Sequence, residues 1–109
     1  MITTERLQLL LRVADRALAH QIMLDDATES SRRLDQGYYD FFEEHGRPFS
    51  DSRPINPEVP EFLPVIEATR ELYIARCNAR QSANTAKRKL KLAVRAVERY
   101  DAASTQEAA

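Results

Sequence analysis

A chain of 109 residues has room for one domain, and two glycines, no tryptophan and 43% hydrophobic residues favour a helical body over a sheet. With a formal net charge of −1, the chain lacks the strong excess of basic residues that is typical of dedicated nucleic-acid-binding domains. A lone cysteine, Cys77, excludes an internal disulfide, so we predict a reducing, cytoplasmic location.

The first predicted helix covers residues 3–44. Thr3 or Thr4 can cap its N-terminus, and Glu5 lies in the first turn, where negative charge is favourable. Gly37 costs about 1 kcal/mol relative to alanine inside a helix, so we expect a kink there. Apolar and small residues recur every three or four positions, with Gln21 as the one long polar member of the series, and mark the expected packing face: Leu7, Leu10, Ala14, Ala17, Leu24, Thr28, Ser31, Leu34, Tyr38 and Phe41.

The most apolar run of this helix, Leu7 to Val13, contains Arg12 and is followed at once by Asp15 and Arg16. It is too short and too charged for the core of a signal peptide or for a membrane span. We therefore predict a chain that has no membrane contact.

A proline-rich connection over residues 45–60 follows, since four prolines in this stretch prevent a regular helix. The second predicted helix covers residues 61–103, and residues 104–109 read as a frayed tail. Two long helices with a short link predict an antiparallel hairpin inside a single domain, residues 1–109. The predicted register opposes Phe41 to Val65, Leu34 to Leu72, Ser31 to Ala75, Leu24 to Ala83 and Leu7 to Tyr100.

A hairpin of two helices leaves apolar residues without cover, because each helix has only one neighbour. A homodimer that forms a four-helix bundle would cover them without any cofactor. The predicted dimer interface contains Leu9, Val13, Ile22, Ile74, Cys77 and Leu92.

The second helix also carries a basic stripe. Residues 70–100 hold nine Arg and Lys against two acids, whereas residues 25–44 hold seven acids against two arginines. A row of bases at every turn can contact successive phosphates, but it can also be a solvated face or pair with acids of a second subunit. The candidates for nucleic-acid binding are Arg80, Lys87, Arg88, Lys91 and Arg95.

Most aromatic residues lie near the predicted turn of the hairpin. Tyr39, Phe42 and Phe49, with Glu43 and Glu44 as an acidic rim, are candidates for binding a basic protein partner. The alternative is an aromatic cluster that closes the open end of the hairpin.

No catalytic or metal-binding constellation emerges from the sequence. A di-metal bundle needs Glu-x-x-His pairs, and neither His20 nor His45 has an acid three residues earlier. In the hairpin register Cys77 lies far from His20, so a nucleophilic pair is not expected. We predict that the protein is not an enzyme and holds no metal or cofactor. An enzyme that binds an anionic substrate with Arg, Lys and Glu is a further alternative.

These patterns predict a small non-enzymatic adaptor or inhibitor that acts by protein–protein interaction, with an unidentified partner. Short chains of this kind are typical of the accessory proteins that phages and mobile elements carry. The alternative is a dimeric nucleic-acid-binding protein that uses the basic stripe of the second helix.

Overall fold

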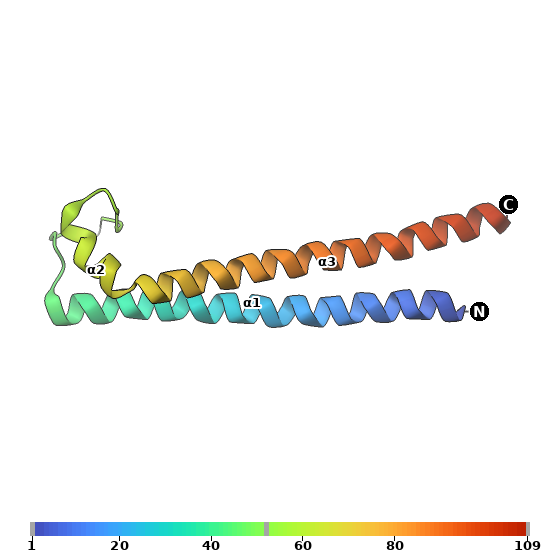
Figure 1. The fold of residues 1–109 in the computed structure, drawn as a ribbon, viewed down its shortest axis with the longest axis horizontal. Helices are drawn as coiled ribbons and strands as arrows, with labels where there is room; N and C mark the ends of the chain where they lie inside the picture. Colours follow the sequence, from blue (N-terminus) through green and yellow to red (C-terminus); the bar gives the residue numbers. More distant parts are fainter. Residues whose placement is uncertain (1, 52, 109) are drawn as a thin grey trace. The chain divides into compact units, whose positions relative to one another are not determined.

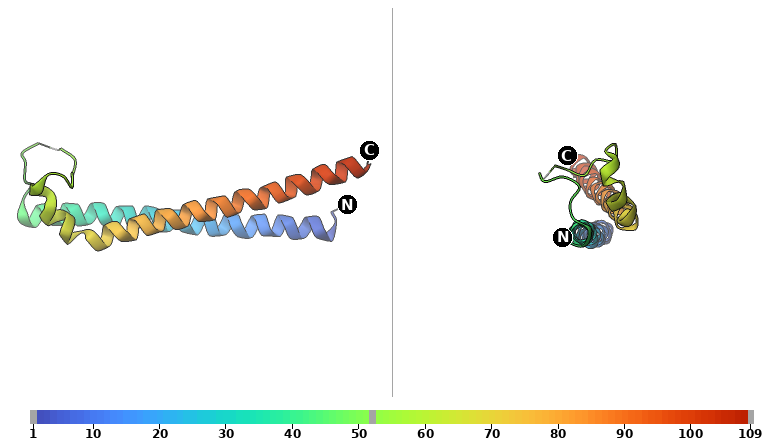
Figure 2. Two further views of the ribbon diagram at one scale, coloured as in Figure 1. Left: turned by 45° about the horizontal axis from the view of Figure 1, so that its top comes forward. Right: turned by 90° about the vertical axis from the view of Figure 1, so that its left-hand side faces the viewer.

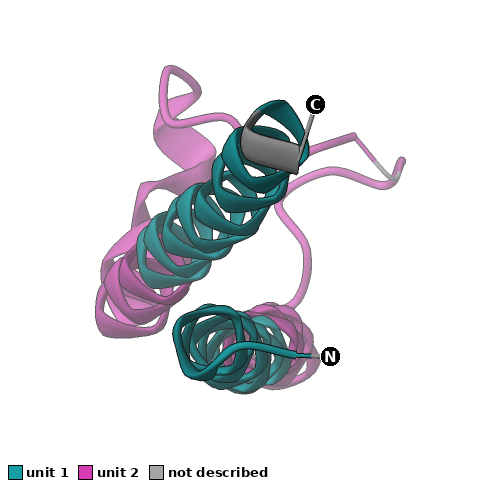
Figure 3. Ribbon diagram, turned by 90° about the vertical axis from the view of Figure 1, so that its right-hand side faces the viewer, with its two compact units in different colours: residues 1–25, 80–109 teal, residues 26–79 magenta. Residues whose placement is uncertain are grey.

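The computed structural model describes residues 2–51 and 53–108, with side chains up to residue 106. Within them it contains α1 (Thr4–His45), the short 3-10 helix η1 (Pro60–Phe62), α2 (Leu63–Ala68) and α3 (Arg70–Ala108) (Figure 1). No strand occurs in the described residues, which confirms the predicted all-α class. The chain divides into two compact units, residues 1–25 with 80–109 and residues 26–79 (Figure 3).

Unit 1 (residues 1–25 and 80–109) pairs the first part of α1 with the last part of α3. The Arg6 Nε lies 2.9 Å from an Asp101 carboxylate oxygen, and the Thr3 and Tyr100 hydroxyls are 2.6 Å apart. These contacts make the two segments antiparallel. Ala83 and Ala93 are buried between the helices, where small side chains let the backbones approach.

Unit 2 (residues 26–79) contains the last part of α1, the connection, η1, α2 and the start of α3. Its core consists of Leu34 from α1, Phe62 from η1 and Val65 from α2, each at most 3% exposed. Figures 1 and 2 show α2 lying beside the C-terminal end of α1. Helix α1 thus packs against α3 or its preceding turns in each unit, which agrees with the predicted helical hairpin.

Gly37 does not interrupt α1, which is helical from Thr4 to His45. A Cβ atom at this position would lie 2.7 Å from Leu72 Cδ1 and 3.5 Å from Thr69 Cγ2. The helix thus continues past Gly37 as expected, and the glycine allows close packing of α1 on the second half of the chain.

The predicted continuous helix over residues 61–103 is divided at Thr69. The Thr69 hydroxyl donates to the Val65 carbonyl at 2.7 Å, and the Thr69 N–H donates to the same oxygen at 3.0 Å. Such back-bonding by a threonine bends helices, and Thr69 here has φ −106° and ψ 10°. The interruption is local, because the Thr69 carbonyl already accepts the N–H of Tyr73 at 2.9 Å.

The expected frayed tail over residues 104–109 is helical as far as Ala108, and Ala109 lies outside the described residues. The Thr105 hydroxyl donates to the Asp101 carbonyl at 2.9 Å, one turn earlier. Alanine, glutamine and glutamate are good helix formers, so the polar composition that suggested fraying is compatible with a helix.

The side of α1 that faces α3 in unit 1 differs from the expected one. Leu7 and Leu24, predicted to be buried against α3, are 48% and 40% exposed, whereas Leu9 and Val13 are half-buried. Apolar residues occur nearly all around this part of α1, so periodicity alone does not select the packing side. In the structure Arg6, which forms the ion pair with Asp101 of α3, lies on the side of α1 that faces α3.

None of the helices in the described part of the chain is both long enough and apolar enough to cross a membrane.

Candidate interaction surfaces

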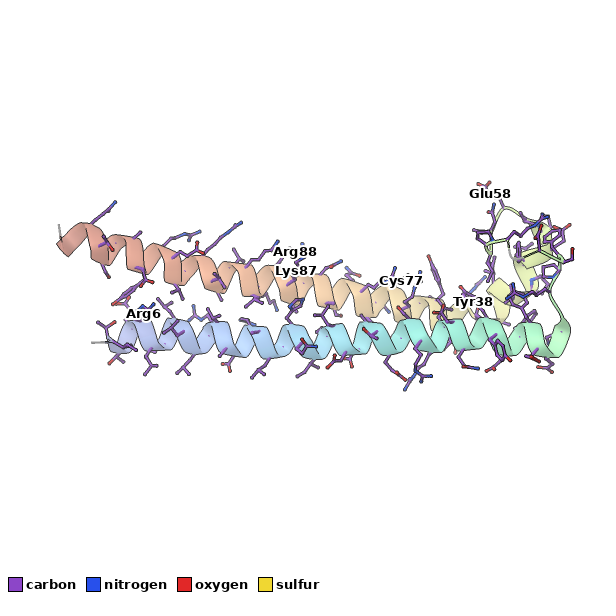
Figure 4. All side chains as sticks on the ribbon, turned by 180° about the vertical axis from the view of Figure 1, so that it is seen from behind. Arg6, Tyr38, Glu58, Cys77, Lys87 and Arg88 are labelled. Atoms are coloured by element: carbon purple, nitrogen blue, oxygen red, sulfur yellow. The ribbon has the colours of Figure 1, made fainter. Side chains whose placement is uncertain are left out.

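The basic stripe of α3 lies in unit 1 and is open to solvent. All five predicted members, Arg80, Lys87, Arg88, Lys91 and Arg95, are exposed. Figure 4 shows Arg88 on the side of α3 that points away from α1. Within the described residues no carboxylate lies within 4 Å of any of the five. Unit 1 carries ten Arg and Lys against six Asp and Glu, a formal charge of +4.

A stripe of apolar side chains covers the outer face of α1 in the same unit. Leu7, Leu11, Leu18 and Ile22 are between 48% and 66% exposed. They are separated by four, seven and four residues, and this spacing places them on one face of a helix. The half-buried Leu9 lies on the face toward α3. We call these four exposed residues the α1 stripe.

The predicted dimer residues do not form one surface. Ile22 belongs to the α1 stripe, whereas Leu9 and Val13 contribute to packing inside unit 1. On α3, Leu92 is 59% exposed in unit 1. In unit 2, Ile74 and Cys77 are also exposed. Sequence reasoning did not group Leu7 with Ile22, because it assigned Leu7 to the face that packs against the second helix.

The predicted aromatic patch near the end of α1 is only partly open. Tyr39 is 59% exposed, and its hydroxyl donates to the Glu43 carboxylate at 3.1 Å. The Phe42 ring is half-buried, packs edge-on against Phe41 and lies 4.9 Å from the Arg47 guanidinium. Glu44 is exposed beside it.

Phe49 is also engaged inside the unit. Its ring centroid lies 5.6 Å from that of the buried Phe62, and the Arg53 guanidinium carbon lies over the Phe49 ring, 3.9 Å from its centroid. Arg53 in turn donates two hydrogen bonds to the Asp51 carboxylate. Of the three predicted aromatic anchors, Tyr39 is exposed, whereas Phe42 packs against Phe41 and Phe49 packs against Phe62.

A cleft that sequence reasoning missed lies in unit 2 next to the interruption at Thr69. It has a volume of about 570 Å³, and we call it the Arg76 cleft. One wall comes from the connection, which folds back over α3, and this could not be read from helical periodicity. The lining residues are Tyr38, Ile55, Pro57, Ile66, Thr69, Arg70, Tyr73 and Arg76.

The polar groups of the Arg76 cleft are few. The Arg76 guanidinium lies 5.3 Å from the Tyr73 ring centroid, and its Nε is buried without a hydrogen-bond partner. Burial raises the pKa of the Tyr38 hydroxyl above its ordinary value, and the nearby positive charge of Arg76 opposes this shift. Figure 4 shows Tyr38 on the side of α1 toward α3. The cleft therefore combines mainly apolar walls with two arginines, of which Arg70 is paired with Glu67 and Arg76 has no carboxylate within 4 Å in the described residues.

No group of three His, Cys, Asp or Glu side chains that could hold a metal ion occurs in the described residues. Comparisons of this chain with models of known protein families, with functionally curated proteins and with solved structures gave no match.

Proposed function

We propose that this protein is a non-enzymatic helical adaptor or inhibitor that acts through protein–protein contact as a homodimer. The observation that carries the proposal is the α1 stripe, Leu7, Leu11, Leu18 and Ile22, which is exposed in the single chain. Each large aliphatic side chain that becomes fully buried contributes about 1.5–3 kcal/mol. A row of four on one helix face is typical of an interface between helices.

The spacing of the α1 stripe favours a second copy of the chain as its partner. The separations of four, seven and four residues read the same in both directions. A two-fold, antiparallel pairing of α1 segments would oppose Leu7 to Ile22 and Leu11 to Leu18 of the second copy. Ala14 would lie at the centre, where a small side chain permits close approach. Each copy contributes two helices, so the product is a four-helix bundle.

Charge supports the same pairing. Asp15 and Arg12 lie on one side of the α1 stripe and are exposed. In the antiparallel arrangement Asp15 of one copy and Arg12 of the other would lie on the same side of the interface, offset by two residues. Such surface pairs add little affinity, but they favour one register over its neighbours.

Sedimentation equilibrium tests the dimer. The variant Leu11→Gln/Leu18→Gln should be monomeric at a micromolar concentration at which the wild type is dimeric. The control variant Leu63→Gln changes a residue of similar exposure, 52%, that lies outside the α1 stripe, and it should stay dimeric. A monomeric wild type would contradict the dimer, and a dimeric double variant would contradict this interface.

The partner-binding surface of an adaptor is proposed in unit 2, around the exposed Tyr39 and its acidic neighbours Glu43 and Glu44. A pull-down from host cytosol, with and without nuclease, should capture a protein that resists nuclease. Tyr39→Ala should release this protein, and the loss of a hot-spot aromatic typically costs 2 kcal/mol or more. Circular dichroism must show that the variant remains helical.

Nucleic-acid binding is the second candidate, favoured by the open basic stripe of unit 1. Changing Lys87, Arg88, Lys91 and Arg95 together to Gln keeps good helix formers at exposed positions. If the stripe binds nucleic acid, this variant loses the binding, and wild-type affinity falls with salt with a slope of about one per phosphate contact. An adaptor that works through unit 2 would retain its partner in the same variant.

A further inference from the structure

The Arg76 cleft holds a positive charge that the described part of the chain does not neutralise. No carboxylate lies within 4 Å of the Arg76 guanidinium there, and the buried Nε has no acceptor. The half-buried side chain is held against the Tyr73 ring. A guanidinium that is partly removed from water and lacks an acceptor is a strong donor for an incoming anion.

We infer that the Arg76 cleft binds a segment of a partner protein in which a carboxylate side chain stands next to an apolar one. The carboxylate would accept hydrogen bonds from Arg76, and the apolar side chain would pack on Ile55, Pro57 and Ile66. This proposal rests on the protein-binding function proposed above and names the chemistry of the partner.

The size and walls of the cleft favour this ligand over a phosphate. A volume of about 570 Å³ is within the range of pockets that enclose a few side chains. The walls are mainly Ile, Pro and Tyr, which suit an apolar group, and burying a doubly charged phosphate there would cost more than burying a carboxylate. Only one guanidinium is available, since Arg70 is already paired with Glu67 at 2.6 Å.

The surface next to the cleft favours a peptide segment over a small molecule. Tyr73, which lines the cleft, is 49% exposed, and the following residue, Ile74, is 50% exposed. A small carboxylic acid would leave this apolar surface in water, whereas a chain of several residues would cover it. The negative charge of Asp35 near Tyr38 and of Glu67 at the rim opposes ligands with several acids.

Selection from a displayed library of random short peptides tests the inference on the whole protein. The wild type should enrich peptides with Asp or Glu next to an aromatic or branched aliphatic residue. Arg76→Gln should bind the enriched peptides on the order of tenfold more weakly, as expected for the loss of a charge-assisted pair. Arg99→Gln, which changes an exposed arginine further along α3 and outside the lining, is the control and should bind normally.

Changing the peptide provides a test that does not depend on the folding of a protein variant. Replacing its Glu by Gln should weaken binding to the wild type as much as Arg76→Gln does. Equal binding of the two peptides, enrichment of basic or neutral peptides, or no enrichment would overturn the inference. Binding of free phenylacetate without any peptide binding would show a small-molecule site and would also overturn it.

The sedimentation assay distinguishes rejection of the acidic ligand of the Arg76 cleft from rejection of the proposed homodimer. Arg76→Gln leaves the α1 stripe untouched, so sedimentation of this variant should match that of the wild type. Enrichment of basic peptides would leave protein binding intact and reject only the acidic ligand.

Discussion

Gly37 and Leu72 should be energetically coupled. Alanine in place of Gly37 gains about 1 kcal/mol of helix propensity. Its Cβ, however, would meet Leu72 Cδ1 at 2.7 Å, and overpacking of this kind costs about 1–3 kcal/mol. Leu72 is half-buried and can rotate, so the cost lies near the lower end of this range. We expect Gly37→Ala to lower the free energy of unfolding by zero to about 2 kcal/mol.

The effect of Gly37→Ala on the free energy of unfolding should change sign in a Leu72→Ala background. The shorter side chain removes the clash and leaves the propensity gain, so Gly37→Ala should now stabilise by about 1 kcal/mol. Urea unfolding of the four proteins at one concentration measures the coupling, because stability of a dimer depends on concentration. A stabilisation of about 1 kcal/mol in both backgrounds would show that Gly37 and Leu72 are not in contact.

Two further predictions concern local features of α1. Gly46→Ala should destabilise by about 1–2 kcal/mol in urea unfolding, because Gly46 has φ +77° and a Cβ there meets nothing, so the cost is backbone strain; equal stability would refute this. Hydrogen bonds from Arg32 and Arg33 hold the pKa of the Glu29 carboxyl at about 2, below its ordinary value of 4.5. Glu29 therefore stabilises above pH 4.5 and loses this contribution as the pH falls toward 2, and Glu29→Gln should weaken the pH dependence in that window.

The long helices and their antiparallel order could be predicted from the sequence. Apolar residues at helical spacing run through most of both segments, and small residues matched small residues in the expected register. Ala83 and Ala93 are indeed buried. The packing side of α1 near Leu7 could not be predicted, since apolar residues surround the helix there and their spacing is compatible with more than one packing side.

The Arg76 cleft lay beyond sequence reasoning for a different reason. It exists because Thr69 interrupts the second helix and because the connection places Ile55 and Pro57 over α3. Neither the interruption at Thr69 nor the position of the connection produces a periodic pattern of apolar residues in the sequence. A threonine inside a helix usually causes no interruption, and four prolines predict an irregular segment without predicting where it lies. Arg76 therefore looked like one more member of the basic stripe.

Position gives Arg76 and Arg88 different chemistry, although both lie on α3. Arg88 is exposed in a unit of charge +4, so it stays hydrated and gains affinity only when several bases contact several phosphates together. Arg76 is half-buried in a unit with six Arg and Lys against eleven Asp and Glu, a formal charge of −5. That field repels polyanions, and the apolar walls penalise strongly hydrated ones. A single carboxylate on an apolar segment meets both constraints, whereas a nucleic acid meets neither.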